Sequence, residues 1–208
     1  MKKLITISIL LSLFGIEANR LTKTEKAYEP IAKTGDLIFQ TEVGRSQAHA
    51  IQAATFSPYN HVGVVVEESG KFYVYEAHGP VKKISLSKYV NRKGTGSRFV
   101  VYRHEDVDKS AQSKIKTYVR RQVGKPYDNR LSWGNSSLYC SELAYKALGI
   151  AKLDLEEPPK MKDMKVSLVI GKIIPNGYKL SSVNMDDFVV APSHLTRDKH
   201  IYKVYQNW

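Results

Sequence analysis

The segment His61–Ala77, HVGVVVEESGKFYVYEA, carries the clearest structural signal in the chain. Both of its halves are rich in β-branched and aromatic residues, which favour strands. Between the halves, the polar Glu68-Ser69-Gly70 supplies the glycine that a tight turn needs. The segment therefore predicts an antiparallel β-hairpin.

The pairing within this hairpin determines which of its side chains share a face of the sheet. A turn centred on the last two of the three polar residues places Glu76 opposite Gly63. Because alternate residues of a strand share a face, Glu76 and His61 become diagonal neighbours, and we expect the missing side chain of Gly63 to leave the space between them open. His78 would directly oppose His61. A three-residue loop would instead turn Glu76 to the opposite face.

The rest of the chain adds further elements around this hairpin. Periodicity and turn signals predict strands over 36–40 and 97–103, helices over 47–54, 109–123 and 140–148, short strands over 164–174 and 178–180, and an apolar return to the core over 188–192. We expect Gly149 to close the last helix. This order predicts an α+β fold, with an antiparallel sheet packed against helices, in a single domain over residues 19–208.

The N-terminus has the features of a secretory signal peptide over residues 1–18. Lys2 and Lys3 precede an uncharged, mostly apolar run from Leu4 to Ile16, and the small residue Ala18 suits cleavage. That run is too short to span a bilayer, and no other stretch is apolar enough to do so. We therefore expect an exported protein, periplasmic or secreted, without a transmembrane span. An uncleaved amphipathic helix is the alternative.

The chain is strongly basic, with a formal net charge of +12. Such a charge favours contact with an anionic surface, which for an exported protein is the cell envelope, although solubility alone explains it equally well. No nucleic-acid-binding motif is present, so nucleic acid is not an expected partner. The sequence contains neither a cluster with metal-ligand spacing nor a glycine-rich phosphate loop, and we expect no metal and no cofactor.

Cys140 is the only cysteine in the chain, so no disulfide can form within it. It begins the apolar stripe of the expected helix over 140–148 and follows the turn-forming Gly134-Asn135-Ser136-Ser137. In the first turn of a helix, free backbone N–H groups and the helix dipole favour a thiolate and can hold an oxyanion. Cys140 is therefore a candidate nucleophile. An inert buried cysteine explains the same pattern almost as well.

A thiol nucleophile needs a base and a group that orients this base. Of the six histidines, His61 is the best placed, because it opens a strand directly after a turn, and His78 is second. Glu76 is the candidate orienting group, since a carboxylate within an otherwise apolar strand needs a partner, unless it lies on a solvated face. Three histidines in polar surroundings are expected at the surface: His104, His194 and His200.

Four ordered segments resemble the YiiX/YaeF-type family, which belongs to the NlpC-like hydrolases with a circularly permuted papain fold. The segments are Thr34–Gln40 (TGDLIFQ), Tyr59–Gly63 (YNHVG), Val74–Ala77 (VYEA) with Gly79-Pro80-Val81, and Leu138–Leu143 (LYCSEL). In such families the histidine precedes the cysteine, which is the reverse of papain's order. The resemblance extends from about Thr34 to Leu148, has a looser echo over 190–193, and is weakest after Ile150.

The resemblance implies a role for each of four residues. Cys140 would be the nucleophile, with His61 as its base and Glu76 as the residue that orients the imidazole. Tyr139 resembles an active-site tyrosine of the family and would assist the oxyanion. Members of the family are amidases or peptidases that act on cell-wall peptides or on lipid-linked amides, so the resemblance implies a substrate of this kind.

The expected function is hydrolysis of an amide bond, by an exported cysteine hydrolase, through a thioester on Cys140. Gln40 and Ser46 are weaker candidates for lining the substrate cleft, since a strand end and a helix cap explain them equally well. Acyl transfer by the same three catalytic groups is one alternative function. A non-catalytic binding module of the same fold is another.

Overall fold

The computed structural model describes residues 27–41, 57–92, 98–164 and 184–208. Several features expected from the sequence lie outside these ranges, namely the signal peptide over 1–18, Ser46 with the helix over 47–54, the strand over 178–180 and nearly all of the strand over 164–174. Among the described residues, no helix has both the length and the apolar character that crossing a membrane requires.

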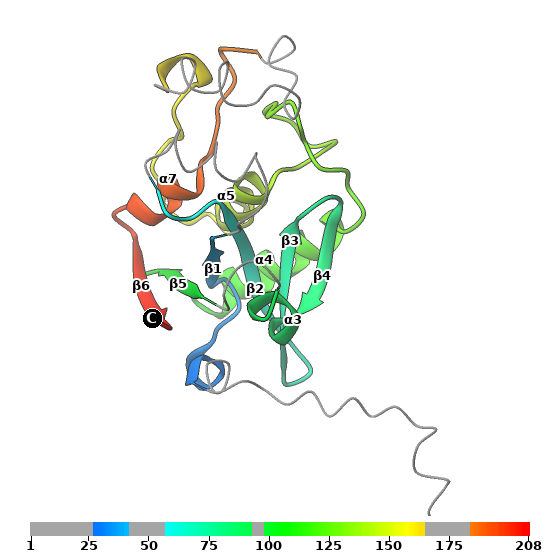
Figure 1. Ribbon diagram of the computed structural model, residues 1–208, viewed down its shortest axis with the longest axis vertical. Coiled ribbons are helices and arrows are strands. Elements are labelled where there is room, and N and C mark those ends of the chain that lie inside the picture. The colour runs from blue at the N-terminus through cyan, green and yellow to red at the C-terminus, as the bar shows by residue number, and fades with distance from the viewer. Residues whose placement is uncertain (1–26, 42–56, 93–97, 165–183) are drawn as a thin grey trace, which may run out of the picture.

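Six strands form one antiparallel sheet, in the order β4-β3-β2-β1-β5-β6 (Figure 1). The strands are β1 (Leu37–Gln40), β2 (His61–Glu68), β3 (Lys71–Ala77), β4 (Val81–Ser85), β5 (Phe99–His104) and β6 (Ile201–Gln206). The two outer strands, β4 and β6, are not among those expected from the sequence. With the helices that pack on it, this sheet confirms the expected α+β fold.

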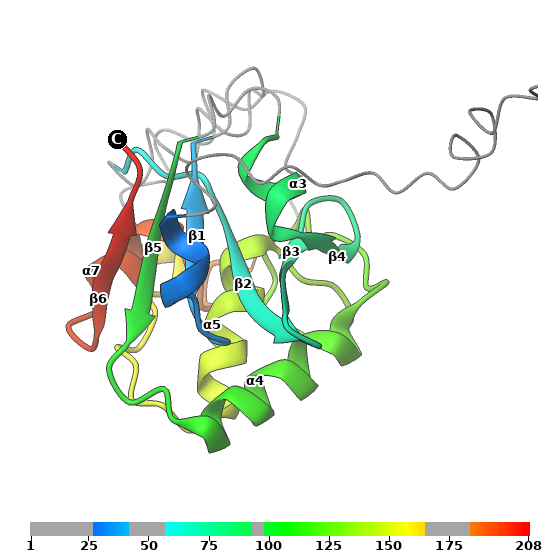
Figure 2. The same cartoon turned by 90° about the horizontal axis from the view of Figure 1, so that it is seen from below.

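Helices pack on both faces of the sheet (Figure 2). On one face, α4 (Lys109–Gln122) and α5 (Cys140–Ile150) share the larger hydrophobic core with the central strands. On the other face, the short α3 (Leu86–Val90) closes a smaller core. The remaining described helices are η1 (Glu29–Ile31), η2 (Met161–Asp163) and α7 (Pro192–Arg197). The apolar segment before α7 returns to the core, as expected.

The structure contradicts the expectations for Gly149 and His104. Gly149 does not close α5, because the helix continues to Ile150 and is capped by Ala151. His104 does not lie at the surface but is buried in β5, where its Nε2 hydrogen-bonds with the backbone carbonyl of Asp154 at 2.6 Å. This bond satisfies an imidazole within the core, and nothing in the neighbouring sequence indicates it.

The central hairpin forms with the predicted register. Glu68 pairs with Lys71, and the pairing continues inward to Val64 and Tyr75. The two turn residues have positive φ values, 51° at Ser69 and 73° at Gly70. A type I′ turn requires this combination, and its twist matches that of two antiparallel strands. As predicted, His61 at the start of β2 and Glu76 in β3 therefore lie on the same face of the sheet.

The space beside Gly63 is filled rather than open, which corrects the sequence expectation. A Cβ atom at this position would lie 2.3 Å from Cγ1 of Val74 and 3.2 Å from the ring of Tyr89. Side chains from β3 and α3 thus pack directly against the backbone of β2. Glycine is required here because of this close approach.

Replacing Gly63 with alanine is expected to lower the free energy of unfolding by about 1–3 kcal/mol, since the added methyl group must displace Val74 or Tyr89. Urea titration followed by circular dichroism measures this loss. Gly149→Ala is the matched control, because a Cβ atom there meets nothing within 4 Å. Within a helix that change should leave stability unchanged or raise it by up to about 1 kcal/mol. Equal stability of both variants would contradict the packing argument.

Candidate active site

The candidate site lies where the first residue of β2 meets the first residue of α5. His61 opens β2, Cys140 opens α5, and Glu76 is the penultimate residue of β3. The hairpin register brings Glu76 to His61, and the packing of α5 on β2 and β3 brings the thiol to the same imidazole. All three residues are buried, with exposed fractions of 4% or less.

Nitrogen atoms of three side chains surround the carboxylate of Glu76 and stabilise its ionised form. Its Oε2 lies 2.7 Å from Nε2 of His61, and its Oε1 lies 2.5 Å from a guanidinium nitrogen of Arg92. The ammonium group of Lys82 lies 3.6 Å from the same Oε1. Burial alone would raise the pKa of Glu76, but the hydrogen bonds and charges of His61 and Arg92 outweigh it and lower the pKa to about 2.

His61 lies between this carboxylate and the thiol. Burial disfavours its protonated form, but hydrogen bonds with Cys140 and Glu76, together with their charges, raise the pKa of His61 to about 10. Because Nε2 faces Glu76, Nδ1 is the ring nitrogen left for Cys140. The geometry therefore favours an imidazolium between the thiol and the carboxylate, with the proton on Nδ1 available for transfer at the sulfur.

Two aromatic rings hold the imidazole of His61 in place. The ring of Tyr89 stacks on it at a centroid distance of 5.9 Å and an interplanar angle of 26°. The ring of His78 meets it edge-on, at 5.4 Å and 82°, consistent with its expected position opposite His61. Tyr89 is itself anchored, since its hydroxyl donates to the backbone carbonyl of Ile38 at 2.9 Å. The imidazole thus has little freedom to leave the thiol.

The backbone at the start of α5 is suited to holding an oxyanion. The N–H of Leu143 donates to the carbonyl of Tyr139 at 3.0 Å, which is the first hydrogen bond of the helix. The N–H groups of Cys140 and Ser141 precede this bond, so they have no carbonyl partner within the helix. Such N–H groups beside a nucleophile stabilise the negative oxygen of a tetrahedral intermediate.

The residues on either side of the nucleophile grip the same peptide segment. The hydroxyl of Tyr139 accepts a hydrogen bond from the N–H of Val190 at 3.0 Å, and the hydroxyl of Ser141 donates to the carbonyl of Val190 at 2.7 Å. We call these two bonds the Val190 clamp. In this arrangement Tyr139 positions the nucleophile turn, and its contribution to the oxyanion stays a prediction.

A buried ion pair braces the loop in front of the nucleophile. Glu142 lies two residues after Cys140 and pairs with Lys146 at 2.7 Å. Lys146 also hydrogen-bonds to the carbonyl of Gly134 and to Oδ1 of Asn135, in the turn that precedes α5. Burial outweighs the attraction of Lys146 and raises the pKa of Glu142 to about 7. The pair thereby links the first turn of α5 to the preceding loop.

The two weaker candidates for the substrate cleft have different outcomes. Ser46 lies outside the described residues. Gln40 pairs with His61 across β1 and β2, is buried, and donates from Nε2 to the carbonyl of Tyr89 at 3.0 Å. Its Oε1 has no hydrogen-bond partner within the part of the chain that the structure describes. Gln40 therefore supports the residue that stacks on His61, and a contact with substrate stays a prediction.

Sequence reasoning missed Arg92 and Tyr89, which complete the surroundings of the His61–Glu76 pair. Neither belongs to a motif with recognisable spacing. One signal could have pointed to a further donor: a buried carboxylate has two oxygens to satisfy, and a single histidine reaches only one of them. Which of the many basic residues provides it depends on the path of the chain after α3.

A cysteine at the head of a helix, packed on a sheet that carries a histidine and a carboxylate, is the arrangement expected of the papain-like hydrolases. Here the histidine precedes the cysteine, so the order is permuted. The model of the family "Permuted papain-like amidase enzyme, YaeF/YiiX, C92 family" matches residues 31–205, and the chain belongs to this family. This membership confirms the resemblance and the permuted papain-like fold expected from the four segments.

Two relatives extend the comparison. The chain is 33% identical over 195 residues to the uncharacterized protein YiiX of Escherichia coli strain K12, covering 88% of this chain and 89% of that protein. A crystal structure of YiiX from Escherichia coli O157:H7 matches with a TM-score of 0.75 and 34% identity, over 85% of this chain and 98% of that chain. The similarity therefore extends over nearly the whole fold.

The crystal structure from Escherichia coli O157:H7 is described as that of a metalloprotein. In the present chain, the described residues include no group of three or more His, Cys, Asp or Glu side chains placed to hold a metal ion. At the candidate site, Nε2 of His61 faces Glu76, while Arg92 and Lys82 surround the carboxylate with positive charge. These residues do not fit a bound cation, and we derive no step through one.

Proposed function

We propose that the protein is a thiol amidase in which Cys140, His61 and Glu76 form the catalytic triad. The observation that carries this proposal is the buried imidazole of His61, which lies between the thiol and a carboxylate 2.7 Å from its Nε2. Membership in an amidase family supports an amide as the substrate. A binding module of the same fold would have no need for a protonated imidazole beside a thiol.

The reaction follows from the positions of these groups. The thiolate of Cys140 attacks the amide carbonyl, and the N–H groups at the start of α5 stabilise the resulting oxyanion. Nδ1 of His61 then gives its proton to the leaving amine as the C–N bond breaks, which leaves a thioester on the sulfur. Water attacks this thioester and its proton passes to His61, and breakage of the C–S bond releases the acid and restores the thiolate beside the protonated imidazole. Glu76 keeps the ring oriented throughout.

A panel of peptidoglycan fragments and lipidated amides, incubated with the protein in ¹⁸O-labelled water, tests the proposal and identifies the substrate. Hydrolysis through a thioester incorporates ¹⁸O into the acid product, which mass spectrometry detects. Added hydroxylamine should divert part of the acyl group into a hydroxamate. Conversion of the acyl group only into amides or esters of added acceptors would instead establish an acyltransferase. Absence of any product across the panel would favour a binding module.

Export places this activity in the cell envelope, where cell-wall peptides and lipid-linked amides occur. The basic start and apolar run of residues 1–18 support this part of the proposal. The protein isolated from its producing cell should therefore begin near Asn19. N-terminal sequencing of periplasmic and culture fractions measures this directly. Soluble cytosolic protein that retains Met1 would overturn it.

A further inference from the structure

The helix α4 presents an unusually one-sided charge. Its 14 residues, KSAQSKIKTYVRRQ, include five basic residues and no acidic one. The apolar residues of the helix, such as Ile115 and Val119, are buried against the sheet and α5. The basic residues therefore lie along the outer side of the helix, where solvent or a partner meets them.

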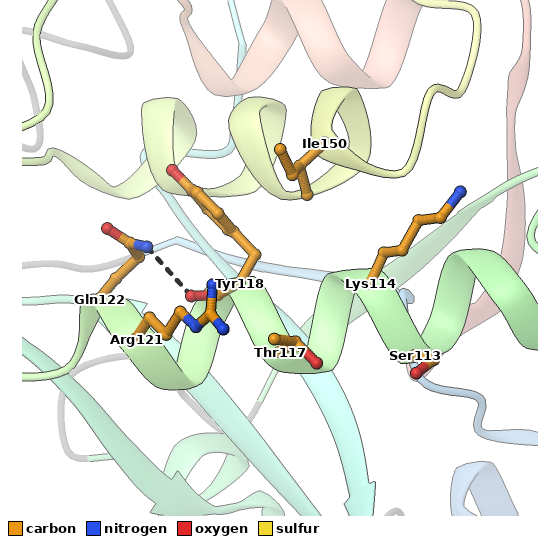
Figure 3. Close-up of a pocket in the computed structure, with 7 residues that line it drawn as sticks. All are labelled: Ser113, Lys114, Thr117, Tyr118, Arg121, Gln122 and Ile150. Atoms are coloured by element: carbon orange, nitrogen blue, oxygen red, sulfur yellow. Dashed lines mark hydrogen bonds between the residues drawn. The ribbon is translucent and has the colours of Figure 1, made fainter.

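An open groove of about 350 Å³ lies between this outer side of α4 and the end of α5 (Figure 3). Lys114, Tyr118 and Arg121 line it from α4, and Ile150 lines it from α5. In Figure 3 the side chain of Ile150 projects from α5 toward α4. The residues that line the groove include no carboxylate, so nothing in its wall neutralises the two cations.

Some basic side chains of α4 have a hydrogen-bond or ion-pair partner within the protein, and others do not. Lys116 donates to the backbone carbonyl of Glu67 at 2.8 Å, and Arg120 lies 4.0 Å from a carboxylate oxygen of Glu68. Lys114 and Arg121, by contrast, have no hydrogen-bond or ion-pair partner among the described residues. They are seven residues apart, which is two helical turns, so they lie on the same side of α4. Together they form a pair of cations facing the groove that no described carboxylate compensates.

An exposed aliphatic side chain lies beside these charges, since Ile150 in the wall of the groove is 53% exposed. A hydrophilic polyanion, such as a nucleic acid or an anionic glycan, offers no surface that buries such side chains. The boundary between the head groups and the acyl chains of a bilayer offers both negative charge and apolar surface.

We propose that the groove between α4 and α5 docks the protein onto an anionic phospholipid surface. Lys114 and Arg121 contact the lipid phosphates, and Ile150 enters the head-group region. Ile150 is at the far end of α5 from Cys140, about 15 Å along the helix axis. Docking therefore leaves the candidate site accessible, and it does not depend on the chemistry proposed for that site.

Vesicle flotation tests this inference with the full chain, on phosphatidylcholine vesicles with and without one-third phosphatidylglycerol. The ratio of binding to anionic over neutral vesicles is the readout, because the N-terminal apolar run contributes equally to every variant. The double variant Lys114→Gln/Arg121→Gln should lower binding to anionic vesicles by roughly 30-fold, at about fivefold for each charge. Ile150→Gln should weaken binding even at high salt, where the charges are screened.

The double variant Lys88→Gln/Lys203→Gln is the matched control, with the same change in charge on α3 and β6 instead of α4. It should bind anionic vesicles nearly as well as the original chain, as should Cys140→Ala, which separates this inference from the proposed catalysis. Circular dichroism confirms that each variant is folded. Equal binding to both kinds of vesicle, or an equal loss in the control, would overturn the inference. So would α4-dependent binding to heparin without binding to vesicles.

Discussion

Replacing Cys140 with alanine is expected to reduce turnover of the substrate by at least about 10⁴-fold, because no other group in the triad can form the thioester. The side chain is buried in the larger core, but the change removes only one sulfur atom. The free energy of unfolding should therefore fall by only about 1 kcal/mol. Single-turnover kinetics and urea titration measure the two effects on the same preparation.

The titration of His61 provides a second readout for this variant. The hydrogen bond and charge of Cys140 help to raise the pKa of His61 to about 10, so the alanine variant should show a lower value by NMR. A histidine whose folded pKa lies above its unfolded value of about 6.5 adds stability below that value, and this stability is lost as pH rises through the folded pKa. The loss should therefore begin at lower pH in the variant. Retained turnover would show that the thiol only fills space.

Replacing Glu76 with glutamine is expected to reduce turnover by about 10²-fold or more. The amide keeps an oxygen that His61 can bond, but it removes the negative charge that holds the imidazolium and Arg92 together. The pKa of His61 should fall from about 10, so the alkaline limb of the pH–rate profile should move to lower pH. Glu76→Ala should be at least as impaired, since it also leaves Arg92 without its carboxylate partner.

The contribution of Glu76 to the free energy of unfolding should be lost at acidic pH, whereas that of His61 is lost at alkaline pH. Its folded pKa of about 2 lies below the ordinary value of 4.5. The carboxylate therefore adds stability above about pH 4.5, and this contribution is lost as pH falls through the folded value. For the pH–rate profile, Glu68→Gln is the matched control within the same hairpin, because Glu68 pairs with Lys83 and does not contact His61 or Cys140 among the described residues. An unchanged pH–rate profile for Glu76→Gln would remove Glu76 from the orienting role.

The hairpin and the start of α5 were accessible to sequence reasoning because each rests on local information. Strand alternation and a two-residue turn determine the register, and the register determines that Glu76 faces His61. The apolar periodicity after Cys140 likewise places the thiol at a helix start. Together with the ordered family motifs, these local signals led to the proposed triad, whose roles stay a prediction.

What sequence reasoning missed depends on contacts between distant segments. Arg92 reaches Glu76 only because β4 and α3 turn the chain back across the sheet, and neither element was expected. Gly63 was interpreted as leaving open space, whereas Val74 and Tyr89 occupy it. His104 was placed at the surface because its neighbours in sequence are charged, although its partner is a carbonyl 50 residues away. Side-chain partners of this kind cannot be read from local patterns.

The Val190 clamp determines how late in synthesis the turn around Cys140 can be completed. The bonds that steady the nucleophile turn join Tyr139 and Ser141 to a segment made 51 and 49 residues later. While α5 has emerged from the ribosome but Val190 has not, the turn that carries the thiol lacks these two hydrogen bonds. For the thiol amidase proposed above, we therefore expect no hydrolysis until the segment around Val190 has also emerged from the ribosome, so the connectivity of the fold would limit premature activity.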